Sequence, residues 1–274
     1  MNVSRIYIVA NASKPAALRA LADMKVWCQE RRIEAIPVVD RVPTDAEGAI
    51  VLALGGDGTV LRAAHLFAET TIPILGINLG SLGFLTQAGI ADLTHTVAHV
   101  VEGEYQIEER MRLTYEALGA SASVLNDLVI TGVSESRFCE LELSWGDGIV
   151  SAYPGDGLIL ATATGSTAYS LSAGGPVIVP PAACILATPL AAHKLGIRPV
   201  IFPADEVLEV RPLSDVQLIA DGDSVAEVPA GTSIRVRHCD QPTTLVRLSD
   251  APTFFRILDE KLNWADSEKR RLVD

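Results

Sequence analysis

The segment AIVLALGGDGTVLR, residues 49–62, predicts a buried strand that leads through a glycine-rich turn into a helix. Residues 50–54 form a continuous apolar run bounded by glycine, which is typical of a strand buried on both faces of a parallel sheet. From Thr59 to Phe67 the apolar residues recur at helical spacing. The stretch therefore indicates a strand, a turn and a helix in succession.

The turn, GGDGT at residues 55–59, has a composition suited to binding an anion. Glycines let a ligand approach the backbone, and N–H groups at the start of a helix favour phosphate. Asp57 is the one carboxylate of the turn. It would act either as the base that takes a proton from a hydroxyl nucleophile or as a metal ligand on the phosphates. The structural alternative is a tight turn in which Asp57 supplies turn chemistry alone.

The rest of the chain predicts two kinds of domain. Strand-like and helix-like segments alternate in the first hundred residues, which favours a doubly wound parallel sheet, with a helix opened by Ser13 as its cap. From about Glu104 the pattern becomes that of successive β strands. We expect an α/β domain over 1–104, a mostly β domain over 105–250 and a helical tail over 251–274 that packs back on the first domain. The segments expected as strands are 5–10, 33–39, 50–54, 72–77, 112–118, 124–130, 138–145, 157–161, 197–203, 207–211, 216–220, 232–238 and 243–248. Those expected as helices are 13–32, 59–67, 90–102 and 165–174.

Composition narrows the classes of function. The net charge is −12 and the pI about 4.9, which argues against nucleic acid or an anionic membrane as a partner. Few basic residues are available to a phosphate ligand, so we expect backbone N–H groups and a divalent cation to neutralise it. The four cysteines lie far apart, and no membrane span or signal-peptide pattern occurs. These features predict a cytoplasmic protein.

A second stretch, TATGSTAYSLSAGGP at residues 162–176, combines six serines and threonines with three glycines. Hydroxyls and N–H groups at a strand-to-helix turn suit a ribose, an amide or a base edge. The structural alternative is a Ser/Thr-capped helix that ends at Gly174-Gly175-Pro176. Neither a GxxxxGK[ST] P-loop nor a GxGxxG fingerprint is present, which argues against a dehydrogenase.

These motifs carry a family resemblance. GGDGT resembles the phosphate loop of NAD kinases, of diacylglycerol and sphingosine kinases and, more loosely, of phosphofructokinases. TGSTAYSLSAGGP, residues 164–176, resembles the NAD-binding signature of NAD kinases, which the lipid kinases lack. The loop NLGSLGFLT at 78–86, the pair Asn126-Asp127 and the segment PGDGL around Asp156 are also similar to NAD kinase segments. The resemblance runs from the central strand to about Asp223.

The resemblance implies an NAD kinase/diacylglycerol kinase-like fold and a specific reaction. Such an enzyme transfers the γ-phosphoryl group of ATP, or of polyphosphate, to the 2′-hydroxyl of the adenosine ribose of NAD, with Asp57 as the general base and Mg²⁺ as the expected cation. A neighbouring subunit completes the site in relatives, so a homodimer or homotetramer is expected. The residues expected to bind phosphate or nucleotide are Gly55, Gly56, Gly58, Thr59 and Arg62. Those expected to bind NAD are Asp57, Gly58, Phe84, Asn126, Asp127, Arg137, Asp156, Thr164, Thr167, Ala168, Tyr169, Ser170, Leu171, Ser172 and Asp223.

Several alternatives stay open at this point. Phe84 has a core role as its alternative, Asn126-Asp127 and Asp156 have turn roles, and Arg62 and Arg137 have solvated surface roles. Asp127 replaces the commoner Glu, Pro154 replaces a common basic residue, and Asp223 stands where Gln is common. These departures leave open the choice of NAD or NADH, as the sequence leaves open the choice of ATP or polyphosphate. A lipid kinase and a non-catalytic NAD-sensing module are the other functions considered.

Overall fold

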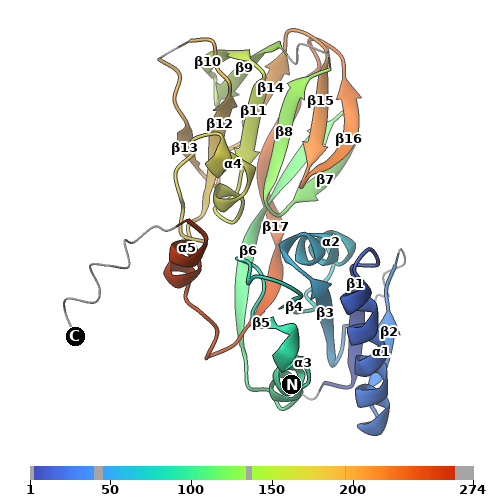
Figure 1. The fold of residues 1–274 in the computed structure, drawn as a ribbon. Coiled ribbons are helices and arrows are strands. Elements are labelled where there is room, and N and C mark those ends of the chain that lie inside the picture. Colours follow the sequence, from blue (N-terminus) through green and yellow to red (C-terminus); the bar gives the residue numbers. More distant parts are fainter. Residues whose placement is uncertain (1–2, 40–45, 134–137, 195, 263–274) are drawn as a thin grey trace, which may run out of the picture. The chain divides into compact units, whose positions relative to one another are not determined.

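A computed structural model describes residues 3–39, 46–133, 138–194 and 196–262 of the chain. By its internal contacts the chain divides into two compact units, which we treat separately (Figure 1). Unit 1 comprises Met1–Glu108 and Thr244–Asp274, and unit 2 comprises Glu109–Thr243. Both boundaries fall inside long strands, β6 and β17. The sequence-based division at 104 and 250 stays a prediction.

Unit 1 is built around a parallel sheet with helices. The strand order is β17-β4-β3-β1-β2, all pairs are parallel, and the short β5 pairs with β4. The elements are β1 (Arg5–Ala10), α1 (Pro15–Glu30), β2 (Glu34–Pro37), β3 (Ala49–Gly55), α2 (Asp57–Leu66), β4 (Ile74–Asn78), β5 (Ala88–Gly89), the 3₁₀ turn η1 (Ile90–Asp92), α3 (Leu93–Val101), the end of β17 (Ile234–Arg247) and α5 (Phe254–Leu262).

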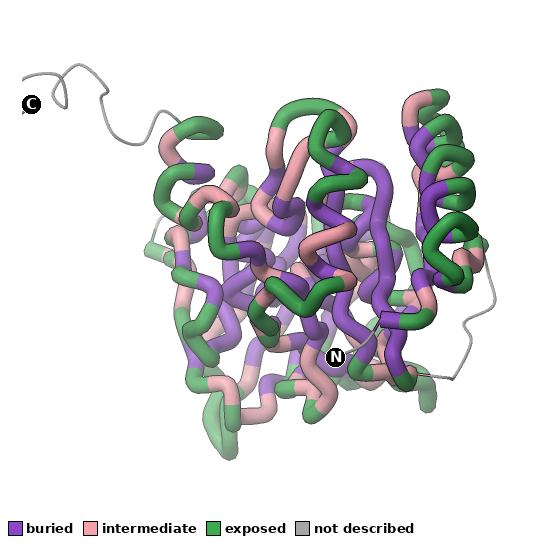
Figure 2. The backbone as a smooth tube through the Cα atoms, turned by 90° about the horizontal axis from the view of Figure 1, so that it is seen from below, coloured by how far each residue is buried: buried purple, intermediate pink, exposed green. Residues whose placement is uncertain are grey.

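The core of unit 1 explains the sheet order. Every residue of β3 is buried, as a central strand covered on both faces requires. Ile50, Leu52 and Leu54 from β3 join one apolar cluster with Met24 of α1 and Val97 of α3. Figure 2 shows the result as buried strands inside and helices at the margin whose residues alternate between exposed and buried.

Unit 2 is a mostly antiparallel β structure. One set of strands runs in the order β10-β9-β14-β17, with β6 paired to β7, and a second sheet has the order β13-β12-β11-β8-β15-β16. Leu128 and Leu158 from the second sheet share an apolar core with Leu141 and Val210 from the first. The elements are β6 (Gln106–Ala117), β7 (Ala120–Val124), β8 (Asp127–Gly132), β9 (Cys139–Trp145), β10 (Gly148–Gly155), β11 (Gly157–Ala161), the 3₁₀ turn η2 (Gly165–Thr167), α4 (Tyr169–Ser172), β12 (Cys184–Leu190), β13 (Val200–Pro203), β14 (Leu208–Pro212), β15 (Val216–Ala220) and β16 (Asp223–Val228).

The predicted fold class is confirmed, and several local predictions are wrong. Ser13 does not cap α1: Lys14 holds that position without a side-chain cap bond, and Pro15 is the first helical residue. The segments 232–238 and 243–248 form the single strand β17, because the polar residues between them continue the ladder. The strand pattern also missed β7, β10 and β16. β7 and β16 are largely exposed and therefore lack a clear apolar alternation, and β10 is exposed in its first three residues. No helix among the described residues is long and apolar enough to cross a bilayer.

Candidate functional site

The glycine turn joins β3 to α2 in unit 1. β3 ends at Gly55, Gly56 is the N-cap residue, and Asp57 is the first residue of α2. A Cβ atom on Gly55 would lie 1.8 Å from the Thr59 hydroxyl oxygen, so the turn closes this tightly because residue 55 is glycine. α2 therefore begins at the carboxyl end of β3, where the first N–H groups of a helix can bind an anion.

The carboxylate of Asp57 is fixed by a loop far away in sequence. Its Oδ2 accepts a hydrogen bond from the Phe84 N–H at 2.9 Å, and its Oδ1 accepts one from the Leu85 N–H at 3.0 Å. A Cβ atom on Gly83 would lie 1.9 Å from Asp57 Oδ1, so the loop approaches the carboxylate as closely as glycine permits. Asp57 therefore has a single, supported orientation.

The supporting loop is itself braced by Asn78 and Thr86. The Asn78 amide donates to the Ser81 carbonyl at 2.5 Å and accepts from the Gly80 N–H at 2.6 Å. The Thr86 hydroxyl accepts from the Gly83 N–H at 2.8 Å. The predicted loop at 78–86 thus shapes the surroundings of Asp57 through its backbone.

A cavity of about 270 Å³ opens beside the glycine turn. Gly56 and Gly58 line it, and a Cβ atom on either would meet nothing within 4 Å, so these two glycines leave space rather than avoid a clash. The other lining residues are Asn11, Lys14, Thr59 and Arg62. Arg62 also donates to the Val39 carbonyl at 2.9 Å, which holds its guanidinium at this edge.

Lys14 is a lining residue that the sequence analysis missed. It follows β1, which lies beside β3 in the parallel sheet, so both strands end at the same edge. That topology was the available signal, because ligands bind at the carboxyl ends of parallel strands. Lys14 also corrects the expectation that few basic residues lie near the turn: with Arg62, two cations line this cavity.

Phe84 lies in the loop next to Asp57. Its ring packs on the Phe254 ring of α5, with ring centroids 5.8 Å apart, and the residue is partly buried. Its backbone N–H, rather than its ring, makes the recorded contact with the glycine turn. A role as a wall for a nucleotide base stays a prediction.

In unit 2 the pair Asn126-Asp127 is held by a second carboxylate. Asp221 Oδ1 accepts hydrogen bonds from the N–H groups of Asn126 at 2.7 Å and Asp127 at 3.1 Å, and Oδ2 accepts one from the Leu125 N–H at 2.8 Å. Asp221 itself has a positive φ of 48°, a strained conformation that brings its side chain back onto this turn. The sequence analysis did not single out Asp221.

The two carboxylates of this turn have perturbed acidity. Burial, with the nearby charge of Asp221 as the second cause, raises the pKa of Asp127 to about 7. Burial also raises the pKa of Asp221, against the three backbone N–H donors and the Arg112 charge, which act in the opposite direction. The Asp127 side chain is therefore poised to change charge near neutral pH.

The hydroxyl-rich stretch, residues 162–176, is hydrogen-bonded to the same turn. The Thr162 hydroxyl donates to the Leu125 carbonyl at 2.6 Å, and the Thr162 N–H donates to the Asn126 carbonyl at 2.9 Å. A Cβ atom on Gly165 would lie 2.1 Å from the Asn126 carbonyl oxygen. The geometry thus joins two segments that the sequence analysis singled out separately.

Within 164–172 the predicted residues divide by exposure. Thr164 is buried and accepts from Arg110 at 3.3 Å, and Ser170 is fully buried and shares a 2.7 Å hydrogen bond with Thr188, so these two hydroxyls brace the turn. Tyr169 and Ser172 are exposed. Thr167, Ala168 and Leu171 are partly exposed. The expected helix over 165–174 is the 3₁₀ turn η2 followed by the single turn α4, because the backbone at Ala168 leaves the helical region.

The remaining predicted positions are spread over unit 2. Asp156 is partly exposed, and its backbone is fixed by the Leu190 carbonyl at 3.0 Å and the Thr131 hydroxyl at 2.7 Å. Asp223 is exposed at the start of β16. Arg137 lies outside the described residues.

Comparison with known proteins decides the family. Residues 7–105 match the ATP-NAD kinase N-terminal domain and residues 125–248 the ATP-NAD kinase C-terminal domain. The chain is 38% identical to an NAD kinase of Heliobacterium modesticaldum, over 93% of this chain and 97% of that protein. It is also 38% identical to an NAD kinase of Moorella thermoacetica, over 97% and 92% of the two chains. The chain belongs to the NAD kinase family.

Comparison with solved structures shows the same fold. A yeast NADH kinase complexed with NADH superposes with a TM-score of 0.85 at 22% identity, covering 96% of this chain and 88% of the other. An Archaeoglobus fulgidus NAD kinase in complex with ATP superposes with a TM-score of 0.75 at 23% identity, covering 94% and 98%. At these identities the likeness shows the fold. Family membership gives no support to the lipid kinase alternative raised by the GGDGT turn.

Proposed function

We propose that the chain is an NAD kinase that transfers the γ-phosphoryl group of ATP to the 2′-hydroxyl of the adenosine ribose of NAD, giving NADP and ADP. The observation that carries this proposal is the fixed carboxylate of Asp57, which stands between Gly56 and Gly58 beside the cavity lined by Lys14 and Arg62. The family assignment gives the acceptor and the donor.

The chemistry follows from that placement. The ribose oxygen forms a bond to the γ-phosphorus while the bond from phosphorus to the β-γ bridging oxygen breaks, and ADP leaves. The proton of the 2′-hydroxyl passes to the Asp57 carboxylate, which acts as the general base. The N–H donors of Phe84 and Leu85 keep the carboxylate in place, so little reorganisation is needed at the moment of transfer.

The phosphates of the donor suit the cavity beside the turn. Lys14 and Arg62 supply positive charge, and the N–H groups at the start of α2 supply hydrogen-bond donors. A divalent cation, with Mg²⁺ as the expected ion, is part of the same proposal. The ion would bind through the substrate phosphates and would neutralise charge developing on them, while Asp57 acts as the base.

The acceptor suits the turn of unit 2. Asn126 offers a carboxamide and Asp127 and Asp156 offer carboxylates for nucleotide hydroxyls, and the partly exposed face of 167–172 offers hydroxyl and N–H groups. The hydrogen bonds between Thr162 and residues 125–126 hold this binding surface rigid. Rigidity lowers the entropic cost of ordering a long, flexible dinucleotide.

A homodimer or homotetramer in the cytoplasm completes the proposal. The β9–β10 hairpin exposes Trp145 and Ile149 at a sheet edge, and Trp145 packs edge-to-face against Phe202 of β13, next to the exposed Ile201. Exposed apolar patches of this kind favour association. All four cysteines are free, as a reducing compartment requires.

The test is a donor and acceptor panel with purified protein and an NADP-specific readout. ATP or polyphosphate as donor is combined with NAD or NADH as acceptor, with and without excess EDTA. We expect NADP from ATP and NAD, loss of turnover in EDTA, and measurable NADPH from NADH, because Pro154 carries no charge to discriminate at that end. Phosphorylation of diacylglycerol, with no phosphorylation of NAD or NADH, would contradict the assignment.

A further inference from the structure

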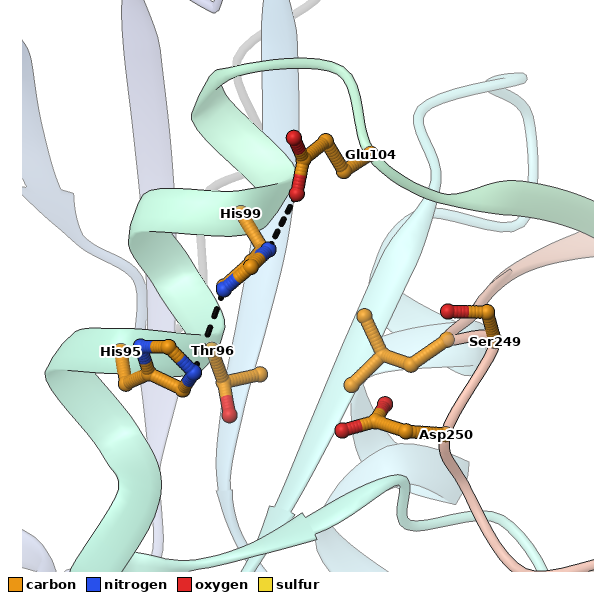
Figure 3. Close-up of a pocket in the computed structure, with 7 residues that line it drawn as sticks. His95, Thr96, His99, Glu104, Ser249 and Asp250 are labelled. Carbon is orange, nitrogen blue, oxygen red and sulfur yellow. Dashed lines mark hydrogen bonds and ion pairs between the residues drawn. The ribbon is translucent and has the colours of Figure 1, made fainter.

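A second cavity in unit 1 lies apart from the glycine turn and shares no lining residue with it. It has a volume of about 200 Å³ and lies between α3 and the segment that follows β17 (Figure 3). His95, Thr96 and His99 line it from α3, Glu104 from the next turn, and Leu248, Ser249 and Asp250 from the other side. The NAD kinase reaction uses none of these residues.

The two histidines converge. They stand four residues apart on α3, so their side chains lie on the same face of the helix. The Nε2 atoms are 3.1 Å apart, and the ring centroids are 4.3 Å apart with ring planes at 81°. If the two rings pointed their Nε2 atoms straight at each other, the ring centroids would lie farther apart than 4.3 Å. The two Nε2 atoms therefore approach each other at an angle. Two Nε2 atoms at this separation can therefore share one further atom.

Glu104 supports the second histidine from behind. Its carboxylate contacts His99 Nδ1, the ring nitrogen that faces away from His95 (Figure 3). The turn that returns Glu104 to this position is fixed by its own backbone: the Glu104 N–H donates to the His99 carbonyl at 2.9 Å, and Gly103 has a φ of +85°. A carboxylate on Nδ1 holds the proton there and places the lone pair of His99 on Nε2, which accepts the 3.1 Å hydrogen bond from His95 Nε2 when no metal is bound. A metal ion would replace the shared proton of that hydrogen bond.

We propose that His95 and His99 chelate a divalent transition-metal ion, with Zn²⁺ as the probe of choice, through their Nε2 atoms. Metal–nitrogen bonds of about 2.0–2.1 Å and the 3.1 Å separation give a ligand angle of about 100°, close to that of tetrahedral or octahedral coordination. Glu104 acts as the outer partner that orients His99. Imidazole ligands suit Zn²⁺, Cu²⁺ and Ni²⁺ and disfavour Mg²⁺.

The rest of the coordination shell is water. Among the described residues no third His, Cys, Asp or Glu joins this pair as a ligand, and the cavity has room for several water molecules. Asp250 faces the histidines across the cavity and adds negative charge near the ion without binding it directly (Figure 3). A site with two protein ligands binds reversibly, so it responds to the concentration of free metal.

The experiment is calorimetric titration of Zn²⁺ into the whole, chelator-treated protein, without nucleotide and with millimolar Mg²⁺ present. The variants are His95→Ala, His99→Ala and Glu104→Gln. The matched control is His65→Ala, an exposed histidine of α2 in the same unit, and His238→Ala with Cys239→Ser measures background binding in unit 2. Melting curves without metal confirm that each variant is folded.

The expected result is one Zn²⁺ per chain in the wild type and in both controls. Loss of either α3 histidine should weaken binding at least tenfold, and Glu104→Gln should weaken it by about tenfold, as outer-shell changes do. Cu²⁺ should bind more tightly than Zn²⁺. Stoichiometry and affinity unchanged in the double variant His95→Ala/His99→Ala, or no binding to the wild type at millimolar Zn²⁺, would overturn the proposal. The test measures metal binding alone, so it is independent of the proposed kinase reaction.

Discussion

Two turns of this protein each contain a carboxylate that accepts backbone hydrogen bonds, but the surroundings of the two carboxylates differ. In unit 1 the carboxylate of Asp57 accepts two backbone N–H bonds from the loop 83–85, and in unit 2 the carboxylate of Asp221 accepts three from residues 125–127. Asp57 stands between two glycines that leave open space, whereas Asp221 is mostly buried behind the turn that it holds. The first arrangement leaves open space on either side of a carboxylate, which suits contact with a reacting group in the proposed reaction. The second presents the backbone and side chains of other residues.

The difference separates two kinds of residue. Asp57 would touch the reacting atoms, and Asp221 would act through Asn126 and Asp127 as a positioning residue. A carboxylate aimed at substrate should affect turnover, and a carboxylate behind a binding turn should affect affinity and stability. The predictions that follow test this separation, starting with the largest effect.

Asp57→Asn should reduce kcat by about 10²- to 10⁴-fold, which corresponds to roughly 3–5 kcal/mol of barrier. The amide keeps the size of the side chain and one acceptor for the loop, but it cannot take the ribose proton. Stabilisation by NAD in a thermal-shift assay should persist, because the acceptor platform lies in unit 2. Asp92→Asn, at another helix start in unit 1, is the control and should leave kcat unchanged. A near-normal kcat in folded Asp57→Asn protein would remove Asp57 as the base.

Gly83→Ala should reduce kcat by about 10²-fold without removing any reacting group. The new Cβ atom would lie 1.9 Å from Asp57 Oδ1, so the carboxylate or the loop must shift, and misplacement of about 1 Å costs this much. Gly89→Ala is the matched control, since its Cβ atom meets nothing within 4 Å. Steady-state kinetics of both variants, with their melting curves, give the comparison. Equal kcat in the two would show that the loop does not position Asp57.

Much of this arrangement could be predicted from the sequence, and the limits have physical causes. The buried run 50–54 and the glycines after it placed Asp57 correctly at the strand-to-helix turn. The sequence did not reveal the loop 83–85 or Asp221 as supports, because the hydrogen bonds of Phe84, Leu85 and Asp221 join residues 27 to 96 positions apart. Lys14 was missed for a similar reason: it lies near the glycine turn because it follows β1, which pairs with β3 in the sheet. The motifs therefore predicted the position of the glycine turn, whereas the contacts that support it became visible only in the fold.

Lys14→Ala should raise the KM for ATP by about tenfold, or roughly 1.4 kcal/mol, with a smaller effect on the KM for NAD. Lys14 lines the cavity beside the glycine turn, and its loss removes one of the two cations there. The control is Lys25→Ala, an exposed lysine of α1 that lies away from this cavity. If Lys14→Ala raised the KM for NAD alone, the cavity would hold the acceptor rather than the donor phosphates.

The smallest effect concerns Asp127 and is one of stability against pH. Its pKa is raised by burial and by Asp221 to about 7 in the folded protein, whereas an unfolded Asp titrates near 3.9. Between these values the unfolded state releases a proton that the folded state keeps, so this residue lowers the free energy of unfolding as pH rises from about 4 to about 7. Asp127→Asn removes this penalty. The buried amide needs its own hydrogen bonds, at a cost of about 1–3 kcal/mol if they are unmade, so the net gain should be on the order of 1 kcal/mol.

That gain should appear as a melting temperature a few degrees higher than that of the wild type at about pH 8, and it should vanish near pH 4. Asp223→Asn is the matched control, because Asp223 is exposed and should leave the pH dependence unchanged. Asp127→Asn should also bind NAD less tightly, since it loses a carboxylate for a nucleotide hydroxyl. A change in melting temperature between pH 4 and pH 7 that is the same in the wild type and in Asp127→Asn would place the titrating group elsewhere. A gain in stability without any loss in NAD affinity would show instead that Asp127 shapes the turn and leaves the contact with nucleotide to Asn126.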